Sequence, residues 1–202
     1  MTSRRPPPRT GRRPGASTTR AEILTAARAS FAEVGYDRTS VRGVAARAGV
    51  DPALVHRFYG SKDDLFVAAL AGAMNPDERI PEVVEGDVGT LGERLIGYFF
   101  SVWEQPPGRD VMIAMLRSAA TNEHAATLLR EFISGEVLGR IAASLGEADS
   151  DLRATLASSQ LLGLAMIRYV VRIEPLASAP PEILSAAVAP TLQRYLTGEL
   201  GV

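Results

Sequence analysis

The sequence predicts an all-α protein with a small N-terminal helix-turn-helix domain and a larger C-terminal helical domain. Apolar residues recur at three- and four-residue steps along most of the 202-residue chain, a spacing that is typical of amphipathic helices. No alternation of apolar and polar residues, as a strand would show, competes with it. The segment from Thr39 to Lys62 has the layout of two short helices joined by a glycine turn, with a third helix starting directly afterwards.

Residues 1–18 are predicted to form a disordered basic arm. Its five arginines are interspersed with Pro and Gly, without an acidic residue or an apolar run, so the segment cannot pack a core. It also lacks the apolar stretch of a signal peptide. Two interpretations stay open: the arm follows the phosphates or enters an adjacent minor groove of DNA, or it only keeps the protein in solution.

The first helix of the three-helix domain, which is expected over residues 19–74, is predicted to start at Thr19. Glu22 stands three residues later, so the two residues form a capping box. An apolar stripe ends at Gly35 and consists of Ile23, Leu24, Ala27, Phe31 and Val34.

The second helix is predicted to be short and to end in a glycine. Thr39 or Ser40 can cap its start, because a hydroxyl oxygen accepts a bond from a free backbone N–H. Gly49 can adopt the left-handed conformation that stops a helix without a Cβ penalty. The apolar stripe consists of Val41, Val44, Ala45 and Ala48.

The third helix is predicted to begin at Asp51 or Pro52, a capping carboxylate followed by a residue that suits the first helical position. Gly60 ends it, and Ser61 with Asp64 then forms a capping-box-like start for the next helix. Leu54, Val55 and Phe58 can hold the third helix to the core. The side chains left to face outward are Pro52, Ala53, His56, Arg57 and Tyr59.

Charge is distributed unevenly along the chain and indicates a nucleic-acid partner. Residues 1–74 contain twelve Lys and Arg against six Asp and Glu, whereas residues 75–202 contain ten against seventeen. The first part therefore has a net charge of +6 and the second of −7, which add up to the −1 of the whole chain. A basic module attached to an acidic one fits phosphate binding, because phosphate neutralisation dominates nucleic-acid affinity.

The segment from Thr19 to Leu70 closely resembles the N-terminal domain of the TetR (tetracycline repressor) family of bacterial transcription regulators. Three elements carry the resemblance in order: ILTAARASFAEVGYDRTS, AARAGV and ALVHRFYGSKDDLF. The resemblance implies that the third helix enters the major groove of double-stranded DNA and that the helix after Ser61 abuts a phosphate. It also implies a homodimeric, ligand-responsive regulator, most simply a repressor that a small apolar effector releases from its operator.

Several residues follow as candidates for DNA contact. Arg57 is the leading one, because a guanidinium can bond guanine O6 and N7 together, for roughly 1–3 kcal/mol of discrimination. Lys62, the only lysine, stands near a helix N-terminus, where a nearby phosphate would favour it. The family commonly has Tyr at the place of His56 and His at the place of Phe58, which leaves the exact phosphate contacts open. Tyr59 falls where the family has a core aromatic residue. The full predicted set is Thr39, Ser40, Arg42, Arg47, Pro52, Ala53, His56, Arg57, Tyr59 and Lys62.

The remainder of the chain is predicted to form a ligand-binding and dimerisation domain over residues 75–202. A loop or broken helix is expected over residues 75–89. Helices follow at about 90–104, 110–123, 125–145, 150–173 and 181–200. The helix from Ser150 is apolar on more than one side, so we expect it to pair with the last helix and with the same two helices of a second subunit.

The effector cannot be inferred from these residues. Aromatic and Met side chains at helical spacing are more often packing than pocket, so only Phe99 and Trp103 are taken as candidate ligand-binding residues. They belong to a larger group that could line an apolar cavity, with Tyr98, Phe100, Met112, Met115, Phe132, Met166 and Tyr169.

Catalysis is not expected, and neither is a cofactor or a metal site. The chain contains no Cys, and its two histidines, His56 and His124, lack ligand spacing to other candidates. No apolar stretch looks long and uninterrupted enough to span a bilayer, so we expect a cytoplasmic protein without a membrane partner. The competing hypothesis is a helical small-molecule binding protein whose basic N-terminal region binds another anionic partner, such as RNA.

Overall fold

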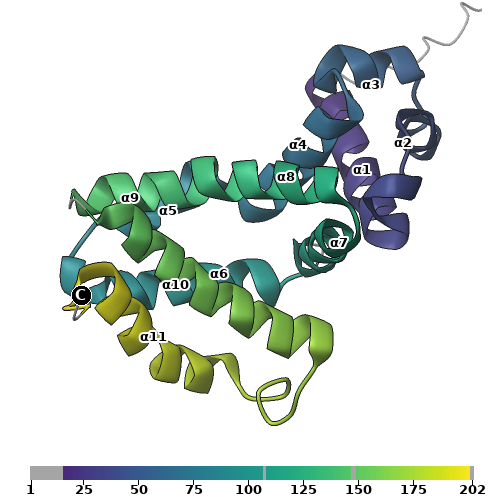
Figure 1. The fold of residues 1–202 in the computed structure, drawn as a ribbon. Helices are drawn as coiled ribbons and strands as arrows, with labels where there is room; N and C mark the ends of the chain where they lie inside the picture. Colours follow the sequence, from purple (N-terminus) through teal and green to yellow (C-terminus); the bar gives the residue numbers. More distant parts are fainter. Residues whose placement is uncertain (1–15, 107, 147–148, 201–202) are drawn as a thin grey trace, which may run out of the picture.

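The computed structural model describes residues 16–106, 108–146 and 149–200, and every regular element in these ranges is helical (Figure 1). This confirms the predicted all-α fold. The N-terminal elements are α1 (Ala16–Arg38), α2 (Val41–Ala48), α3 (Pro52–Tyr59) and α4 (Lys62–Met74). The remaining elements are α5 (Pro76–Val84), the short 3₁₀ helix η1 (Val88–Thr90), α6 (Leu91–Trp103), α7 (Gly108–Thr121), α8 (Glu123–Phe132), the π-helix η2 (Ile133–Leu138), α9 (Gly139–Leu145), α10 (Ser150–Ala165), the π-helix η3 (Met166–Val171) and α11 (Pro181–Thr197).

Helix α1 is longer than the sequence pattern predicted. It begins at Ala16, so Thr19 lies inside the helix and the predicted capping box at Thr19 is wrong. At the other end the helix kinks at Gly35, where φ is 74° and ψ is −178°, and then continues to Arg38. Residues 1–15 of the predicted basic arm lie outside the described residues.

The helices of the N-terminal domain meet in a small apolar core. Phe31 of α1 and Phe66 of α4 pack edge to face with their ring centroids 5.2 Å apart, and both side chains are fully buried. Val44 of α2 and Val55 of α3 complete this core. The short helices α2 and α3 are therefore held by one apolar face each, which leaves their opposite faces free.

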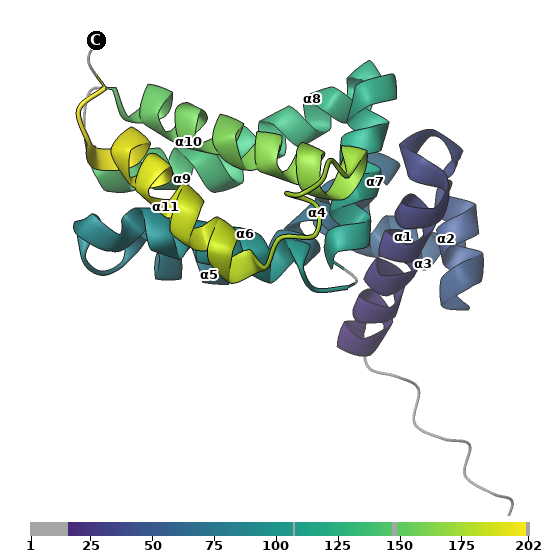
Figure 2. The same ribbon diagram turned by 90° about the horizontal axis from the view of Figure 1, so that it is seen from below.

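The C-terminal elements form a second layer of helices, away from α2 and α3 (Figure 2). The segment predicted as one helix over 125–145 is helical throughout but contains the π-helix η2, which the pattern did not predict. Helices α6 and α11 cross closely at Gly92, where a Cβ atom would lie 2.5 Å from the carbonyl oxygen of Ala189. Glycine at this position therefore sets the distance between the two helices.

Two expectations need correction. Of the two predictions for residues 75–89, a loop or a broken helix, the loop is wrong over Pro76–Val84, which form α5; Pro76 occupies its start, where a missing N–H costs nothing. By length and composition, the helical stretch Ser150–Val171 is apolar enough to cross a membrane, contrary to the sequence-based expectation. Central helices of globular proteins meet the same criteria, yet only 33% of its most apolar part is buried.

Candidate nucleic-acid interface and ligand cavity

The turn between α2 and α3 has the geometry that the sequence predicted. Gly49 is left-handed, with φ 67°, and the N–H of Val50 donates to the carbonyl of Ala45 at 3.0 Å. The Asp51 carboxylate then accepts the N–H of Ala53 at 2.7 Å, and Pro52 occupies the first turn of α3. The free backbone groups at the end of α2 and at the start of α3 thus find hydrogen-bond partners within the turn, which fixes the angle between the two helices.

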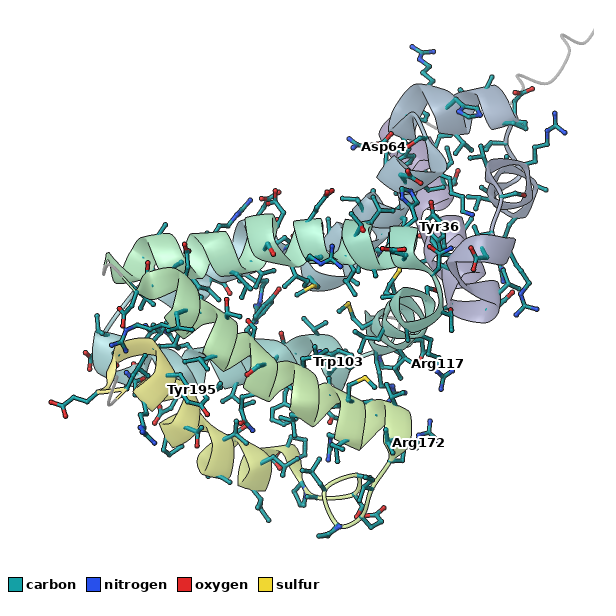
Figure 3. All side chains as sticks on the ribbon, viewed as in Figure 1. Tyr36, Asp64, Trp103, Arg117, Arg172 and Tyr195 are labelled. Atoms are coloured by element: carbon teal, nitrogen blue, oxygen red, sulfur yellow. The ribbon has the colours of Figure 1, made fainter. Side chains whose placement is uncertain are left out.

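Helix α3 lies at the outer end of the molecule with one face turned to solvent (Figure 3). Ala53, His56 and Arg57 are exposed, and Pro52 is half-buried. Tyr59 differs from the prediction: it is 8% exposed, and its hydroxyl donates to the carbonyl of Arg20 at 2.8 Å. Tyr59 therefore belongs to the core and does not face outward.

The two candidate caps of α2 have separate structural roles. Ser40 is exposed, and its hydroxyl oxygen accepts the N–H of Gly43 at 3.1 Å, so Ser40 is the cap. Thr39 is 4% exposed, and its hydroxyl donates to the carbonyl of Gly35 at 2.7 Å. The side chain of Thr39 closes the kinked end of α1 and is not available to a phosphate.

The exposed basic side chains around α3 differ in their partners. Arg47 forms a two-point ion pair with Glu33 of α1. Arg42 and Arg57 are exposed and make no ion pair within the described residues. The Nδ1 atom of His56 lies 2.6 Å from the carbonyl oxygen of Gly60, which leaves Nε2 as the outward ring atom. Arg57 thus carries the free guanidinium of α3.

The start of α4 lies beside this surface. Ser61 and Asp64 form the predicted capping box, with the Asp64 N–H donating to the Ser61 hydroxyl at 3.0 Å and the Ser61 N–H donating to the Asp64 carboxylate at 2.9 Å. Lys62 lies over the ring of Tyr36, with Nζ 4.0 Å from the ring centroid. This cation–π contact holds the only lysine at the N-terminus of α4.

The N-terminal domain joins the helical body through Tyr36, Asp63, Ser118 and His124, a group that we call the Tyr36 junction. The N–H of Tyr36 donates to the Ser118 hydroxyl on α7 at 3.0 Å. The Tyr36 hydroxyl donates to Asp63 of α4, whose second carboxylate oxygen lies 2.8 Å from Nε2 of His124 on α8. The sequence analysis missed this junction, because its bonded members are separated by 27 to 82 residues along the chain.

The junction perturbs two ionisable groups. Burial and then the hydrogen bond to Asp63 raise the pKa of Tyr36 above its ordinary value. The same hydrogen bond, donated by Tyr36, is the main reason that the pKa of Asp63 lies below its ordinary value. Asp63 is therefore ionised at neutral pH and accepts bonds from two different elements at once.

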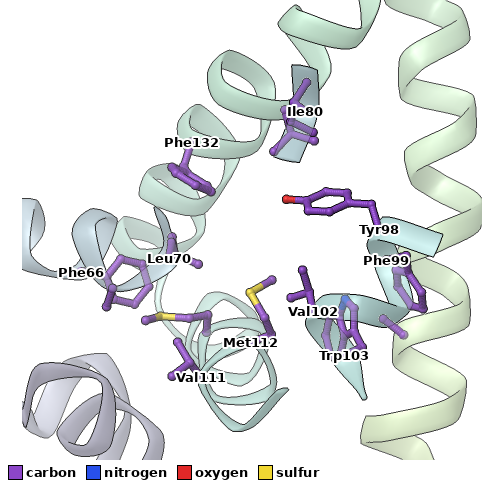
Figure 4. Close-up of a cluster of buried hydrophobic side chains, with 14 of the residues drawn as sticks. Phe66, Leu70, Ile80, Tyr98, Phe99, Val102, Trp103, Val111, Met112 and Phe132 are labelled. Carbon is purple, nitrogen blue, oxygen red and sulfur yellow. The ribbon is translucent and has the colours of Figure 1, made fainter. Parts of the chain in front are cut away.

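A cavity of about 460 Å³ lies inside the helical body, within the size range of small-molecule sites. Its lining residues come from α4, α6, α7, α8, η2, α9 and α10, and almost all are apolar. Phe99 and Trp103, the two predicted ligand-binding residues, both line it, as do Tyr98 and Met112. Tyr98 and Val102 of α6 and Met112 of α7 belong to the same cluster of buried side chains (Figure 4).

The aromatic side chains on one side of the cavity pack against a hydrogen-bonded cluster of Glu104, Arg168 and Tyr169. Trp103 stacks on Tyr169, with ring centroids 5.0 Å apart. Tyr169 and Arg168 of η3 both donate to the carboxylate of Glu104, at 2.7 and 2.8 Å. Burial would raise the pKa of Glu104, but these two hydrogen bonds hold it below its ordinary value. Arg168 also donates to three carbonyls of the segment before α11.

A helix-turn-helix domain with a basic outer face, attached to a helical body, defines the class of DNA-binding transcription regulators. The family described as "Bacterial regulatory proteins, tetR family" matches residues 23–69, and the "Tetracyclin repressor-like, C-terminal domain" matches residues 89–196. The chain belongs to the TetR family. This confirms the predicted resemblance and extends it from the N-terminal domain to the helical body.

Individual relatives agree with this assignment. A TetR-family regulator from Streptomyces coelicolor A3 is 40% identical and has a TM-score of 0.69; the match covers 93% of this chain and 99% of that chain. The SmeT–triclosan complex shows the same fold with a TM-score of 0.65 at 23% identity, over 86% of this chain and 90% of that chain. The HTH-type transcriptional regulator HbdR from Aromatoleum sp. (strain CIB) is 32% identical over 68 residues, or 33% of this chain and 30% of HbdR.

Proposed function

We propose that this chain acts as a cytoplasmic homodimeric repressor that binds a two-half-site operator and leaves it when a small apolar molecule enters the cavity. One observation carries the proposal: α4 and α7 each connect the cavity to the DNA-facing domain. Met74, at the end of α4, lines the cavity, and Lys62 stands at the other end of the same helix. Met112 and Leu116 of α7 line the cavity, and Ser118 of α7 bonds Tyr36.

The proposed DNA surface consists of the exposed face of α3 and its neighbours. Arg57 is placed to contact base edges, and the N-terminus of α4 with Lys62 is placed to receive a phosphate. Arg47 would exchange Glu33 for a phosphate on binding. Thr39 and Tyr59 are omitted because the fold buries them. The complete proposed set is Ser40, Arg42, Arg47, Pro52, Ala53, His56, Arg57 and Lys62.

The proposed dimer surface is the uncovered face of α10 and α11. Within the described ranges, five of the seven exposed large apolar side chains lie on these helices or in the segment between them: Leu152, Leu162, Val171, Ile173 and Ile183. Exposed large apolar side chains along these elements favour a protein partner over solvent. A second copy would present the same face, because a twofold interface is self-complementary.

Release from the operator requires that the ligand prefer one arrangement of the two DNA-binding domains over another. A molecule in the cavity would contact α4 and α7 directly. The structural neighbour SmeT was solved as a complex with triclosan, which supports a response to a small molecule here. The Tyr36 junction would pass a displacement of either helix to α1 and α3.

DNase I footprinting on the DNA that flanks the gene for this protein tests the proposal. We expect a protected stretch with two related half-sites about one helical turn apart. Arg57→Gln should lower specific affinity by roughly tenfold or more and keep nonspecific affinity. Arg117→Gln, at an exposed position on α7 (Figure 3), is the matched control and should bind like the unmodified protein. Equal binding of the flanking DNA and random duplex would overturn the proposal.

A further inference from the structure

The lining of the cavity contains a single charged residue, Arg130. Its side chain comes from α8 and is exposed, so the guanidinium stands at the mouth of the cavity and not at its base. No Asp or Glu among the described residues lines the cavity. A cationic ligand would therefore find no counter-charge there, whereas an anionic group would find one.

Arg130 has no ionic partner among the described residues. The neighbours at three and four residues along its own helical segment are Ala126, Thr127, Ile133 and Ser134, none of which is acidic. Other arginines of the helical body form ion pairs, among them Arg79 with Glu82, Arg140 with Asp77 and Glu136, Arg153 with Asp149, and Arg168 with Glu104. Arg117, Arg172 and Arg194 are unpaired like Arg130 within the described residues, but Arg130 alone among them lines the cavity.

Two hydroxyls accompany Arg130 at the cavity. Ser134 stands four residues further along, on η2, and Ser158 faces the cavity from α10. Neither side chain makes a hydrogen bond within the described part of the chain, whereas the hydroxyls of Thr155 and Ser159, which also line the cavity, donate to carbonyls of their own helix. The Ser134 hydroxyl, four residues from Arg130 on the same helical segment, is thus a free donor that an anion held by Arg130 can accept from.

The helix that carries this group is irregular at this point. Four of the six residues of the π-helix η2 line the cavity: Ile133, Ser134, Val137 and Leu138. π-helical turns are rare and are frequently found at functional sites. The other π-helix, η3, contributes no lining residue, so η2 supports the ligand assignment only together with Arg130 and Ser134.

We infer that the effector is an elongated apolar molecule with one anionic head group, whose tail fills the cavity between Tyr98 and Trp103 while Arg130 and Ser134 hold the head at the mouth. This inference rests on the proposed function, because it names the chemical class of the ligand of the same cavity. The apolar lining supplies affinity for the tail. The charge-assisted hydrogen bonds of Arg130 supply discrimination for the head.

Trp103 provides the measurement, because it is the only tryptophan of the chain and lines the cavity. The full-length protein is titrated with decanoate, decyl phosphate, 1-decanol and decylammonium below their micelle concentrations, and Trp103 emission is followed. We expect at least one of the two anions to bind about tenfold tighter than 1-decanol, as a charged hydrogen bond implies. The preferred anion identifies the head group as carboxylate or phosphate. Decylammonium should bind weakest.

Arg130→Gln should remove the preference for the anion and leave the affinity for 1-decanol unchanged, and Arg117→Gln should retain the preference. Equal affinities for the anions and the alcohol, or a loss of 1-decanol binding in Arg130→Gln equal to the loss of anion binding, would overturn the inference while the cavity still bound apolar molecules. No change in Trp103 emission with any of the four probes would instead count against the proposed ligand response itself.

Discussion

Replacing Ile183 by Ser on α11 should dissociate the proposed dimer. Ile183 is 62% exposed in the single chain, and burying a whole Ile side chain is worth roughly 1.5–3 kcal/mol. Covering the exposed part therefore contributes about 1.5 kcal/mol in each subunit, by the same area relation. A twofold interface counts the change twice, so the dimer should lose about 3 kcal/mol, or roughly a hundredfold in dissociation constant.

Sedimentation equilibrium over a range of protein concentrations measures this constant directly. Val34→Ser is the control, because Val34 is 37% exposed but lies on α1 in the DNA-facing domain. We expect Val34→Ser to leave the association unchanged. A dissociation constant for Ile183→Ser within about threefold of the unmodified value would refute the assignment of this face, since a threefold change corresponds to under 1 kcal/mol.

Three further changes test the fold and the junction. Gly35→Ala should lower the free energy of unfolding by about 2 kcal/mol in urea denaturation, because the backbone conformation at this kink is almost confined to glycine; an unchanged midpoint would contradict the kink. Arg168→Met should cost about 3 kcal/mol by the same method, since it leaves the Glu104 carboxylate without its cationic partner and three carbonyls without their donor, whereas the exposed Arg172→Met should cost little. Asp63 has a lowered pKa, so its contribution to stability is present above about pH 4 and is lost as the pH falls further. Asp63→Asn should flatten the fall in stability between pH 5 and about pH 3, and an unaltered pH profile would show that the Tyr36 hydrogen bond has no energetic role.

The helix-turn-helix was predictable because its determinants are local. Gly49, Asp51 and Ser61 each stop or start a helix through bonds to residues no more than five positions away, so their effect is visible in the sequence itself. The apolar spacing of α6 likewise fixed its bounds to within a residue or two. Local signals were not sufficient everywhere, because Thr19 and Glu22 also have the spacing of a capping box but lie inside α1.

The register of α3 shows where local reasoning failed. Leu54 and Phe58 are four residues apart, and so are Val55 and Tyr59, so an eight-residue helix offers two adjacent apolar stripes of equal spacing. The fold buries Val55 and Tyr59 and leaves the other pair half-buried. The choice depends on the carbonyl of Arg20, which accepts the Tyr59 hydroxyl from 39 residues away. Periodicity alone cannot supply such a contact.

Helices α4 and α7 also determine what kind of motion a ligand could produce. Lys62 and Met74 lie at opposite ends of α4, roughly 18 Å apart at 1.5 Å per residue, so a small tilt forced at the cavity end becomes a larger displacement at the end that faces DNA. Ser118 of α7 bonds Tyr36, and His124 of α8 lies against Asp63 of α4, so a displacement of α7 or α8 would reach the DNA-binding domain through both contacts. In a twofold dimer the two DNA-binding domains would move in opposite directions. The distance between the α3 helices of the two subunits would therefore change by twice the displacement of one. Because half-sites are fixed about 34 Å apart, the operator tolerates a mismatch poorly, and a modest tilt at Met74 is sufficient for release under the proposed function.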